Sequence, residues 1–243
     1  MTFSIAARCP RSGHLGVATS SKALAAGALV PYLRSGVGAI ASQSFVNPYI
    51  GIDGLILLER GEAAEAALSQ LVAKDNGRDL RQAAIVDAQG RVAAYTGRQC
   101  IPWAGHVSGD GYVCLGNILA AEGVVQAMAR AFEGNAGDEL SERLMRALEA
   151  GQQAGGDRRG RQSAGVVVAG EEEYPLCDLR VDDHEDPIEE LRRVFDVYKR
   201  DEVPFMRMMP RRADFIPHWD EVTRIREQVE STLKSEEHAV KEG

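Results

Sequence analysis

Thr2 places a hydroxyl group next to the start of the chain, at the head of a strand-like run of residues 2–8. If Met1 is removed, Thr2 carries a nucleophile and a free α-amine on one residue. The pKa of an α-amine is about 7.7–8.0, so a sizeable neutral fraction can accept the hydroxyl proton near pH 7. This predicts an N-terminal nucleophile. The alternative is that Thr2 is there because threonine favours strands, and a retained Met1 would block the amine as an amide.

A second candidate segment is Gly155-Gly156-Asp157-Arg158-Arg159-Gly160-Arg161-Gln162-Ser163. Arginine side chains bind carboxylate or phosphate groups in pairs of hydrogen bonds. We expect Arg161, Gln162 and Ser163 to bind an anionic substrate, with Asp157 orienting an arginine or the Thr2 amine. The alternative is a solvated glycine-rich loop with ordinary surface arginines.

Two amides and two basic groups complete the candidate set. Gln43 and Asn117 lie in or at the ends of strands of small residues, where an amide can donate to a developing oxyanion; the alternative is that they satisfy buried backbone groups. Lys22 follows the second strand and would lower the pKa of the Thr2 amine by its charge, unless it is merely exposed. His106 would supply a titrating group in a pocket wall, or serve a structural role in its loop.

The acidic run Asp182-Asp183-His184-Glu185-Asp186 offers metal ligands in sequence. It precedes a predicted helix, where acidic residues also cap exposed N–H groups and complement the helix dipole. We favour capping and predict no metal site and no cofactor. Metal-assisted hydrolysis at Asp182, Asp183 and His184 is the alternative.

Composition excludes several classes of protein. The net charge is −8 and the isoelectric point about 5.2, which disfavours a nucleic-acid-binding protein. No apolar run reaches the roughly 18 residues of a membrane helix, and no signal peptide is visible. The widely spaced Cys9, Cys100, Cys114 and Cys177 indicate reduced thiols and a cytoplasmic location. With nucleic acid and membrane disfavoured, we expect the binding partner to be a small-molecule substrate or ligand.

The order of elements predicts the architecture. Strands are expected at 2–8, 15–21, 36–45, 81–87, 91–96, 111–116, 164–169 and 176–182, the first two as a hairpin and the last at an edge. One pair of helices is expected at 51–60 and 62–74, a second pair between 123 and 151, and a final helix at 186–199.

Paired helices do not form the single crossovers of a doubly wound parallel sheet. The pattern therefore favours an α+β protein built as a four-layer αββα sandwich of two antiparallel sheets. An open α+β sheet with helices on one face is the alternative. We predict one domain over residues 1–200. Residues 201–243 are predicted to be a partly helical extension, whose apolar segment 203–216 packs on the domain or on a partner subunit of a homo-oligomer.

Several stretches together carry a family resemblance over about residues 1–200. They are Thr2-Phe3-Ser4-Ile5-Ala6-Ala7-Arg8, Leu29-Val30-Pro31, Gly36-Val37-Gly38-Ala39, Asn47-Pro48, Cys100-Ile101-Pro102-Trp103-Ala104-Gly105-His106, Gly116-Asn117-Ile118-Leu119, 155–164 and 179–184. In these stretches the chain resembles the family known as domain of unknown function 1028. The resemblance implies an N-terminal-nucleophile (Ntn) hydrolase-like fold and supplies no reaction.

The opening is also similar, more loosely, to proteasome-type subunits. In those, an acidic residue ends the second strand and a lysine lies near the third. Here the second strand ends in Thr19-Ser20-Ser21-Lys22, and Arg34 is the candidate positive charge. Thr2 at the head of the first strand of the predicted sandwich nevertheless leads us to expect a hydrolase of small amides or related C–N bonds, with Thr2 as nucleophile. The missing acid favours the alternative, a non-catalytic small-molecule-binding or scaffold protein that kept the fold.

Overall fold

The computed structural model describes residues 2–213, 220 and 222–231. Met1, whose removal the Thr2 chemistry requires, lies outside the described residues. So does part of the predicted partner segment 203–216. The chain divides into two compact units, Met1–Phe195 and Asp196–Gly243, and each is described by itself.

The first unit is a mixed α+β structure with two sheets, and every strand pair in them is antiparallel. One open sheet, the alternative above, does not describe it. The larger sheet has the order β10-β9-β2-β1-β8-β7, and the smaller has the order β3-β4-β5-β6. The strands are β1 (Thr2–Arg8), β2 (Leu15–Ser21), β3 (Pro31–Arg34), β4 (Gly38–Ser44), β5 (Arg81–Asp87), β6 (Val92–Thr96), β7 (Gly105–Gly109), β8 (Tyr112–Asn117), β9 (Ser163–Ala169) and β10 (Pro175–Val181).

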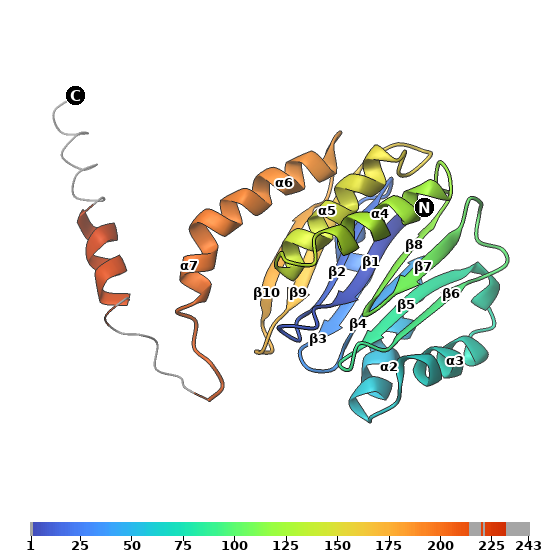
Figure 1. The fold of residues 1–243 in the computed structure, drawn as a ribbon, viewed down its shortest axis with the longest axis horizontal. Coiled ribbons are helices and arrows are strands. Elements are labelled where there is room, and N and C mark those ends of the chain that lie inside the picture. The colour runs from blue at the N-terminus through green and yellow to red at the C-terminus, as the bar shows by residue number, and fades with distance from the viewer. Residues whose placement is uncertain (1, 214–219, 221, 232–243) are drawn as a thin grey trace. The chain divides into compact units, whose positions relative to one another are not determined.

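The β1–β2 hairpin forms where the sequence predicts it. Its turn contains Pro10 and Gly13, and Gly13 has a φ of 75°, a conformation that costs glycine little. The Cys9 N–H donates to the His14 carbonyl at 2.8 Å and closes the turn. The hairpin extends away from the chain start, so Thr2 lies at the open end of the pair (Figure 1).

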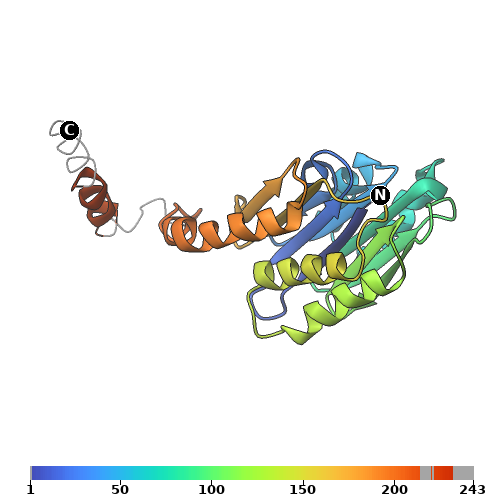
Figure 2. The ribbon, with the colours of Figure 1, turned by 90° about the horizontal axis from the view of Figure 1, so that it is seen from above.

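Two pairs of helices cover the sheets (Figures 1 and 2). On the larger sheet, the helix α5 packs on β1 and β2, and α4 packs on β7 and β8. Glycines permit this contact, because Leu144 lies over Gly16 and Phe3 lies against Gly151. On the smaller sheet, α2 packs on β3 and β4 and α3 on β5 and β6. The helix bounds are α2 (Pro48–Glu59), α3 (Ala64–Lys74), α4 (Gly123–Gly134) and α5 (Leu140–Gln153).

The apolar core has separate parts. One cluster joins the two sheets through small side chains such as Ala6 and Val17 from the larger sheet and Ala41 and Ala84 from the smaller. A second cluster joins the smaller sheet to α2 and α3. The strands β1 and β2 are buried almost throughout. Their lack of apolar–polar alternation therefore has the predicted cause, which is burial on both faces.

Besides a 3₁₀ turn at Arg78–Leu80, three short elements of the first unit were not predicted. They are the helix α1 (Ala26–Leu29) and the strands β3 and β7. Each has only four or five residues, too few to show a period, and β3 begins with a proline. The strand predicted at 36–45 is present as β4, which is shorter than predicted and spans Gly38–Ser44. The edge position of β10, expected from its alternating exposure, is confirmed.

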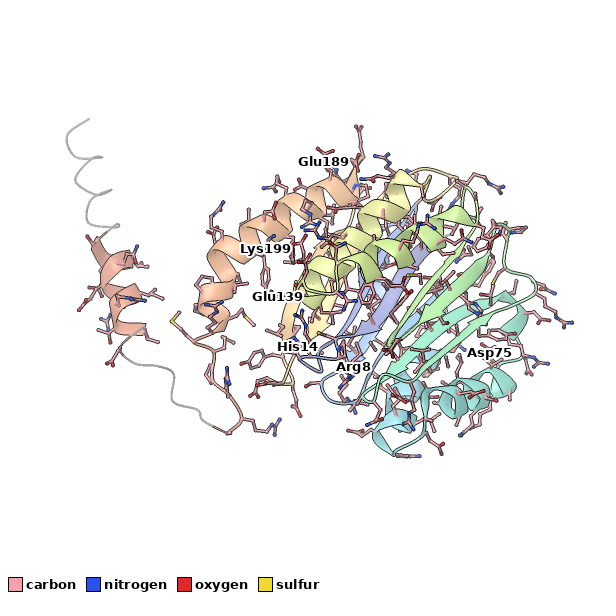
Figure 3. All side chains as sticks on the ribbon, in the orientation of Figure 1. Arg8, His14, Asp75, Glu139, Glu189 and Lys199 are labelled. Carbon is pink, nitrogen blue, oxygen red and sulfur yellow. The ribbon has the colours of Figure 1, made fainter. Side chains whose placement is uncertain are left out.

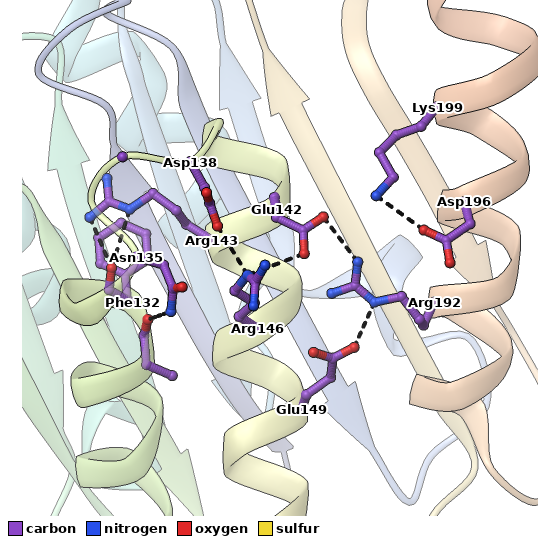
Figure 4. A network of polar contacts seen from close by, with 12 residues as sticks. Phe132, Asn135, Asp138, Glu142, Arg143, Arg146, Glu149, Arg192, Asp196 and Lys199 are labelled. Carbon is purple, nitrogen blue, oxygen red and sulfur yellow. Dashed lines mark hydrogen bonds and ion pairs between the residues drawn. The ribbon is translucent and has the colours of Figure 1, made fainter.

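The helix α6 (Pro187–Val197), which belongs to the first unit up to Phe195, has a proline at its start, as predicted. It is tied to α5 by Arg192, which forms ion pairs with Glu142 at 3.0 Å and Glu149 at 2.6 Å (Figure 4). In the second unit the described backbone continues as a π-helical turn (Tyr198–Glu202) and α7 (Val203–Met206). No helix among the described residues is long and apolar enough to span a membrane.

Candidate functional site

The layer between the two sheets changes from apolar to polar along the strands. Side chains two residues apart share one face of a strand, so on β1 Thr2 and Ser4 share the face of Ala6, which belongs to the inter-sheet core. On the neighbouring strands, too, the side chains that face the other sheet become polar at the end where Thr2 lies. We call this set the polar cluster, and each member is at most 6% exposed: Thr2, Ser4, Thr19, Ser21, Gln43, Gln82 and Asn117.

Thr2 lies at the centre of the polar cluster. Its strand has β2 on one side and β8 on the other, and Asn117 is its direct partner on β8. Its hydroxyl donates to Ser21 Oγ at 3.2 Å. Its carbonyl accepts from Gln43 Nε2 at 3.2 Å. Arg8 and His14, labelled in Figure 3, mark the opposite end of β1 and β2.

The three amides form one buried network across the sheets. Gln43 Nε2 donates both to the Thr2 carbonyl and to Gln82 Oε1, the latter at 2.8 Å. Its own Oε1 accepts from Ser4 Oγ at 2.6 Å. Asn117 Nδ2 donates to Gln82 Oε1 at 3.0 Å. Both amide hydrogens of Gln43 therefore have protein acceptors, whereas Asn117 uses one of its two among the described residues.

Gln82 is the centre of this network and was not among the predicted site residues. Its Nε2 donates to the Gly116 carbonyl at 2.8 Å, to Thr96 Oγ1 at 3.0 Å and to the Gly105 carbonyl at 3.1 Å. The sequence pattern that predicted Gln43, a glutamine inside a strand of small residues, is also present at Gln82 and could have predicted it.

His106 is linked to the polar cluster from outside. Its Nδ1 lies 3.0 Å from Thr96 Oγ1, which accepts from Gln82. Desolvation by burial lowers the pKa of the His106 ring, which favours the neutral imidazole. Its contact with Thr96 places it behind the amide network rather than against Thr2.

Asp157 holds the backbone beside the polar cluster. It is buried, with 6% exposure. Its Oδ2 accepts the Lys22 N–H at 2.8 Å, just past the end of β2. Its Oδ1 accepts the Arg159 N–H at 2.8 Å, and the Arg159 guanidinium forms an ion pair with Oδ2 at 3.3 Å. The carboxylate thus fastens the glycine-rich loop to β2 and makes no contact with Thr2 among the described residues.

The other predicted residues of this loop also bind protein groups. Ser163 is buried, and its hydroxyl donates to the Ala23 carbonyl at 2.6 Å and accepts the Ala26 N–H at 3.0 Å. The Gln162 amide donates to Asp183 at 3.1 Å. Arg161 forms an ion pair with Asp186. The structure does not bring these three side chains to Thr2.

Two other cations flank the start of β1. Lys22 follows β2, and Arg158 donates its N–H at 3.2 Å to the carbonyl of Ile118, the residue after β8. Both side chains are exposed, and neither has an ionic or hydrogen-bonding partner in the part of the chain that the structure describes. Arg34, in contrast, forms an ion pair with Glu59 at 2.7 Å.

Arg34 also lies away from the site along its own sheet. Its partner on β4 is Gly38, whereas Gln43 is five residues further along that strand. At about 3.3 Å per residue this separation is roughly 16 Å. The structure therefore does not bring Arg34 to Thr2.

The backbone is strained next to the polar cluster. The non-glycine residues with positive φ among those described are Ala25 at 52°, Ser44 at 71° and Ile118 at 48°. Ser44 follows Gln43, and Ile118 follows Asn117. For a β-branched residue such as Ile118 this conformation is a true outlier. Such strain gathers at functional sites, and here it sets the ends of strands that carry the polar cluster.

No metal centre is evident in the described part of the chain. Within it, no three or more His, Cys, Asp or Glu side chains come together in a group able to hold a metal ion. In the run considered above, His184 Nδ1 instead accepts the Asp186 N–H at 3.0 Å. Asp182 forms an ion pair with Arg180 at 3.4 Å.

Comparison with known proteins identifies the family. The model of the family of unknown function DUF1028 matches residues 2–191. The chain belongs to this family. It is similar to the crystal structure of protein SPO2555 from Silicibacter pomeroyi, also matched to DUF1028, with 31% identity and a TM-score of 0.82 over 89% of this chain and 94% of that one.

A distant structural similarity is to Anbu, an ancestral beta-subunit, from Yersinia bercovieri. It has 11% identity and a TM-score of 0.39, over 82% of this chain and 96% of that chain. At this level neither fold nor activity carries over. No curated protein matches the chain.

Proposed function

We propose that this chain is an N-terminal-nucleophile hydrolase that cleaves a small amide or related C–N bond, with Thr2 as nucleophile. The observation that carries the proposal is the position of the Thr2 hydroxyl, at the start of a central strand and inside a buried polar cluster. The fold offers support, because two antiparallel sheets share a core and each has a helix pair on its other face. We infer from this the four-layer αββα arrangement of Ntn hydrolases.

The proposed reaction begins once Met1 has been removed. The neutral α-amine of Thr2 accepts the hydroxyl proton while Oγ1 attacks the substrate carbonyl. The tetrahedral intermediate collapses to an acyl-enzyme, and the proton passes from the amine to the departing nitrogen. Water then attacks the ester, with the amine again as base, and the acid is released. The mechanism uses no metal and no cofactor.

Asn117 is the proposed side-chain donor to the oxyanion, because one of its N–H groups has no acceptor among the described residues. Gln43 is better assigned to positioning, since its two N–H groups hold the Thr2 carbonyl and Gln82. Gln82 in turn orients Asn117. A preorganised donor of this kind typically contributes about 3 kcal/mol to transition-state stabilisation.

The proposed substrate carries an anionic group, bound by Lys22 and Arg158. Lys22 follows β2, and Arg158 is hydrogen-bonded through its backbone to Ile118, just after β8, so each lies beside the end of a strand that flanks β1. Neither cation is neutralised by a described acidic side chain. Arg161, the cation expected to do this from the sequence, is paired with Asp186. We assign Arg161 to holding the loop.

A second candidate function is non-catalytic binding of a small anionic molecule. It is favoured by the hydrogen bonds of Thr2, which among the described residues join it to Ser21 and Gln43 and to no acidic or lysine side chain. It is also favoured by the role of Asp157, whose carboxylate accepts the backbone N–H groups of Lys22 and Arg159. In this case Thr2 would be one more member of a structural network.

The deciding experiment combines intact mass with covalent labelling. The purified protein should have the mass of the chain without Met1, and a β-lactone probe should add one acyl group, located on Thr2 by peptide mapping. Thr2→Ala should lose the adduct and Thr2→Ser should keep it, with melting temperatures within about 4 °C of the wild type. A retained Met1, or equal labelling of Thr2→Ala, would refute the hydrolase and leave the binding protein.

A further inference from the structure

Large apolar side chains are exposed on the solvent side of α2 and in the segment just before it. Phe45 is 57% exposed, Tyr49 65%, Ile52 44% and Ile56 37%. We call these four residues the α2 stripe. The opposite side of the helix is also apolar, and Ile50, Leu55 and Leu58 are buried there.

A helix that is apolar on all sides is normally buried all round. In this chain one side of α2 meets the smaller sheet, and the stripe is left open. Single exposed apolar residues are common on protein surfaces, but a contiguous patch marks an interaction site. Tyr49, Ile52 and Ile56 share one face of α2 and Phe45 lies just before the helix, so the α2 stripe is a candidate for such a site.

The spacing of the stripe indicates what kind of occupant fits. Within the helix, Tyr49, Ile52 and Ile56 follow one another at intervals of three and four, and Phe45 lies in the segment that leads into it. This is the spacing of the apolar seam at which two helices pair side by side. The stripe carries no charge, so an acidic or basic partner would gain nothing from it.

We propose that two copies of this chain pair through their α2 stripes. An apolar, uncharged seam complements a second copy of itself, and the same patch on both subunits is what a two-fold dimer uses. From their exposed fractions, the four side chains present on the order of 400 Å² per copy. Pairing would bury about 800 Å², half of a standard interface of roughly 1,600 Å² before the surrounding surface is counted. This inference does not depend on the activity proposed for Thr2.

The first test measures mass in solution by light scattering at micromolar concentrations. The full chain should be a dimer of about twice its 26.3 kDa. Ile52→Glu places two charges in the seam and should shift the species to the monomer. The matched control is Leu24→Glu, which changes a leucine that is 61% exposed and outside the stripe, and it should remain a dimer. Because the seam is uncharged and the chain carries −8, added salt should strengthen the dimer.

The second test does not depend on a destabilising charge. All four native cysteines are buried, so the wild type should not cross-link under mild oxidation. Ile52→Cys should give a disulfide-linked dimer, and Leu24→Cys should not. A monomeric wild type would overturn the proposal. So would a dimer that survives Ile52→Glu and does not cross-link through Ile52→Cys, because another face would then hold the copies together.

Discussion

Replacing Gln82 by leucine tests whether the buried amide network holds the two sheets together at the candidate site. Gln82 is fully buried on β5, and its amide makes five hydrogen bonds. Leucine keeps nearly the same volume and removes all five. It leaves amide hydrogens of Gln43 and Asn117, and the carbonyls of Gly105 and Gly116, without this partner.

The expected cost follows from the number of bonds. Each contributes about 1 kcal/mol net, and each buried group left unpaired adds desolvation that is not recovered. We expect Gln82→Leu to lower the free energy of unfolding by about 4–6 kcal/mol. At about 2–4 °C per kcal/mol for a domain of this size, the melting temperature should fall by roughly 10–20 °C.

The assay is urea unfolding followed by circular dichroism. The matched control is Gln126→Leu, the same change at an exposed glutamine whose amide donates to Glu122, the N-cap residue of its own helix. This control should stay within about 0.5 kcal/mol of the wild type. In a double-mutant cycle, Gln43→Leu and Gln82→Leu together should cost less than the sum, by about 1–2 kcal/mol. A loss below about 1.5 kcal/mol for Gln82→Leu alone would refute the network as a source of stability.

Three further predictions concern other parts of the fold. Gly51→Ala should lower the free energy of unfolding by about 2 kcal/mol, because the added methyl overlaps the Tyr32 ring. Gly123→Ala meets open space and should raise the free energy of unfolding by about 0.5 kcal/mol, a difference that the melting temperatures of the two variants will show. Burial raises the pKa of Asp75, but hydrogen bonds from Arg81, Asn47 and Gly77 outweigh it and hold that pKa below its usual value. This stabilisation is present above about pH 4 and is lost as the pH falls through the lowered pKa. Between pH 5 and 2, the free energy of unfolding should therefore fall more steeply for the wild type than for Asp75→Asn. Urea unfolding that shows the same pH dependence for both proteins would contradict this. Burial raises the pKa of Cys177 to about 12, so a thiol reagent at pH 8 should modify it only after denaturation, which peptide mapping detects.

Much of the first unit could be predicted from the sequence, because its signals are local. Proline and glycine set the β1–β2 turn, and burial on both faces of those strands shows as the absence of charge along them. Apolar residues at helical spacing predicted helices in both pairs. The same signals did not predict α1, β3 and β7, because four or five residues are too few to show a period.

The candidate site could be predicted only in part. Threonine, glutamine and asparagine among small residues indicated Thr2, Gln43 and Asn117, and the structure brings these three together. The arginines of the glycine-rich loop were harder to assign. Arg158 and Arg161 have the same chemistry in the sequence, and only the fold shows that Arg161 meets Asp186.

The sequence by itself therefore determined the longer elements and the kinds of group that their strands present at their ends. It did not determine that β1 lies between β2 and β8, because that pairing joins residues more than a hundred positions apart. Only the tertiary structure placed Gln82 at the centre of the amide network and left Lys22 and Arg158 without described partners. The physical reason is that backbone period and turn chemistry act over a few residues, whereas hydrogen bonds and ion pairs depend on which distant side chains the folded sheets bring within about 3 Å.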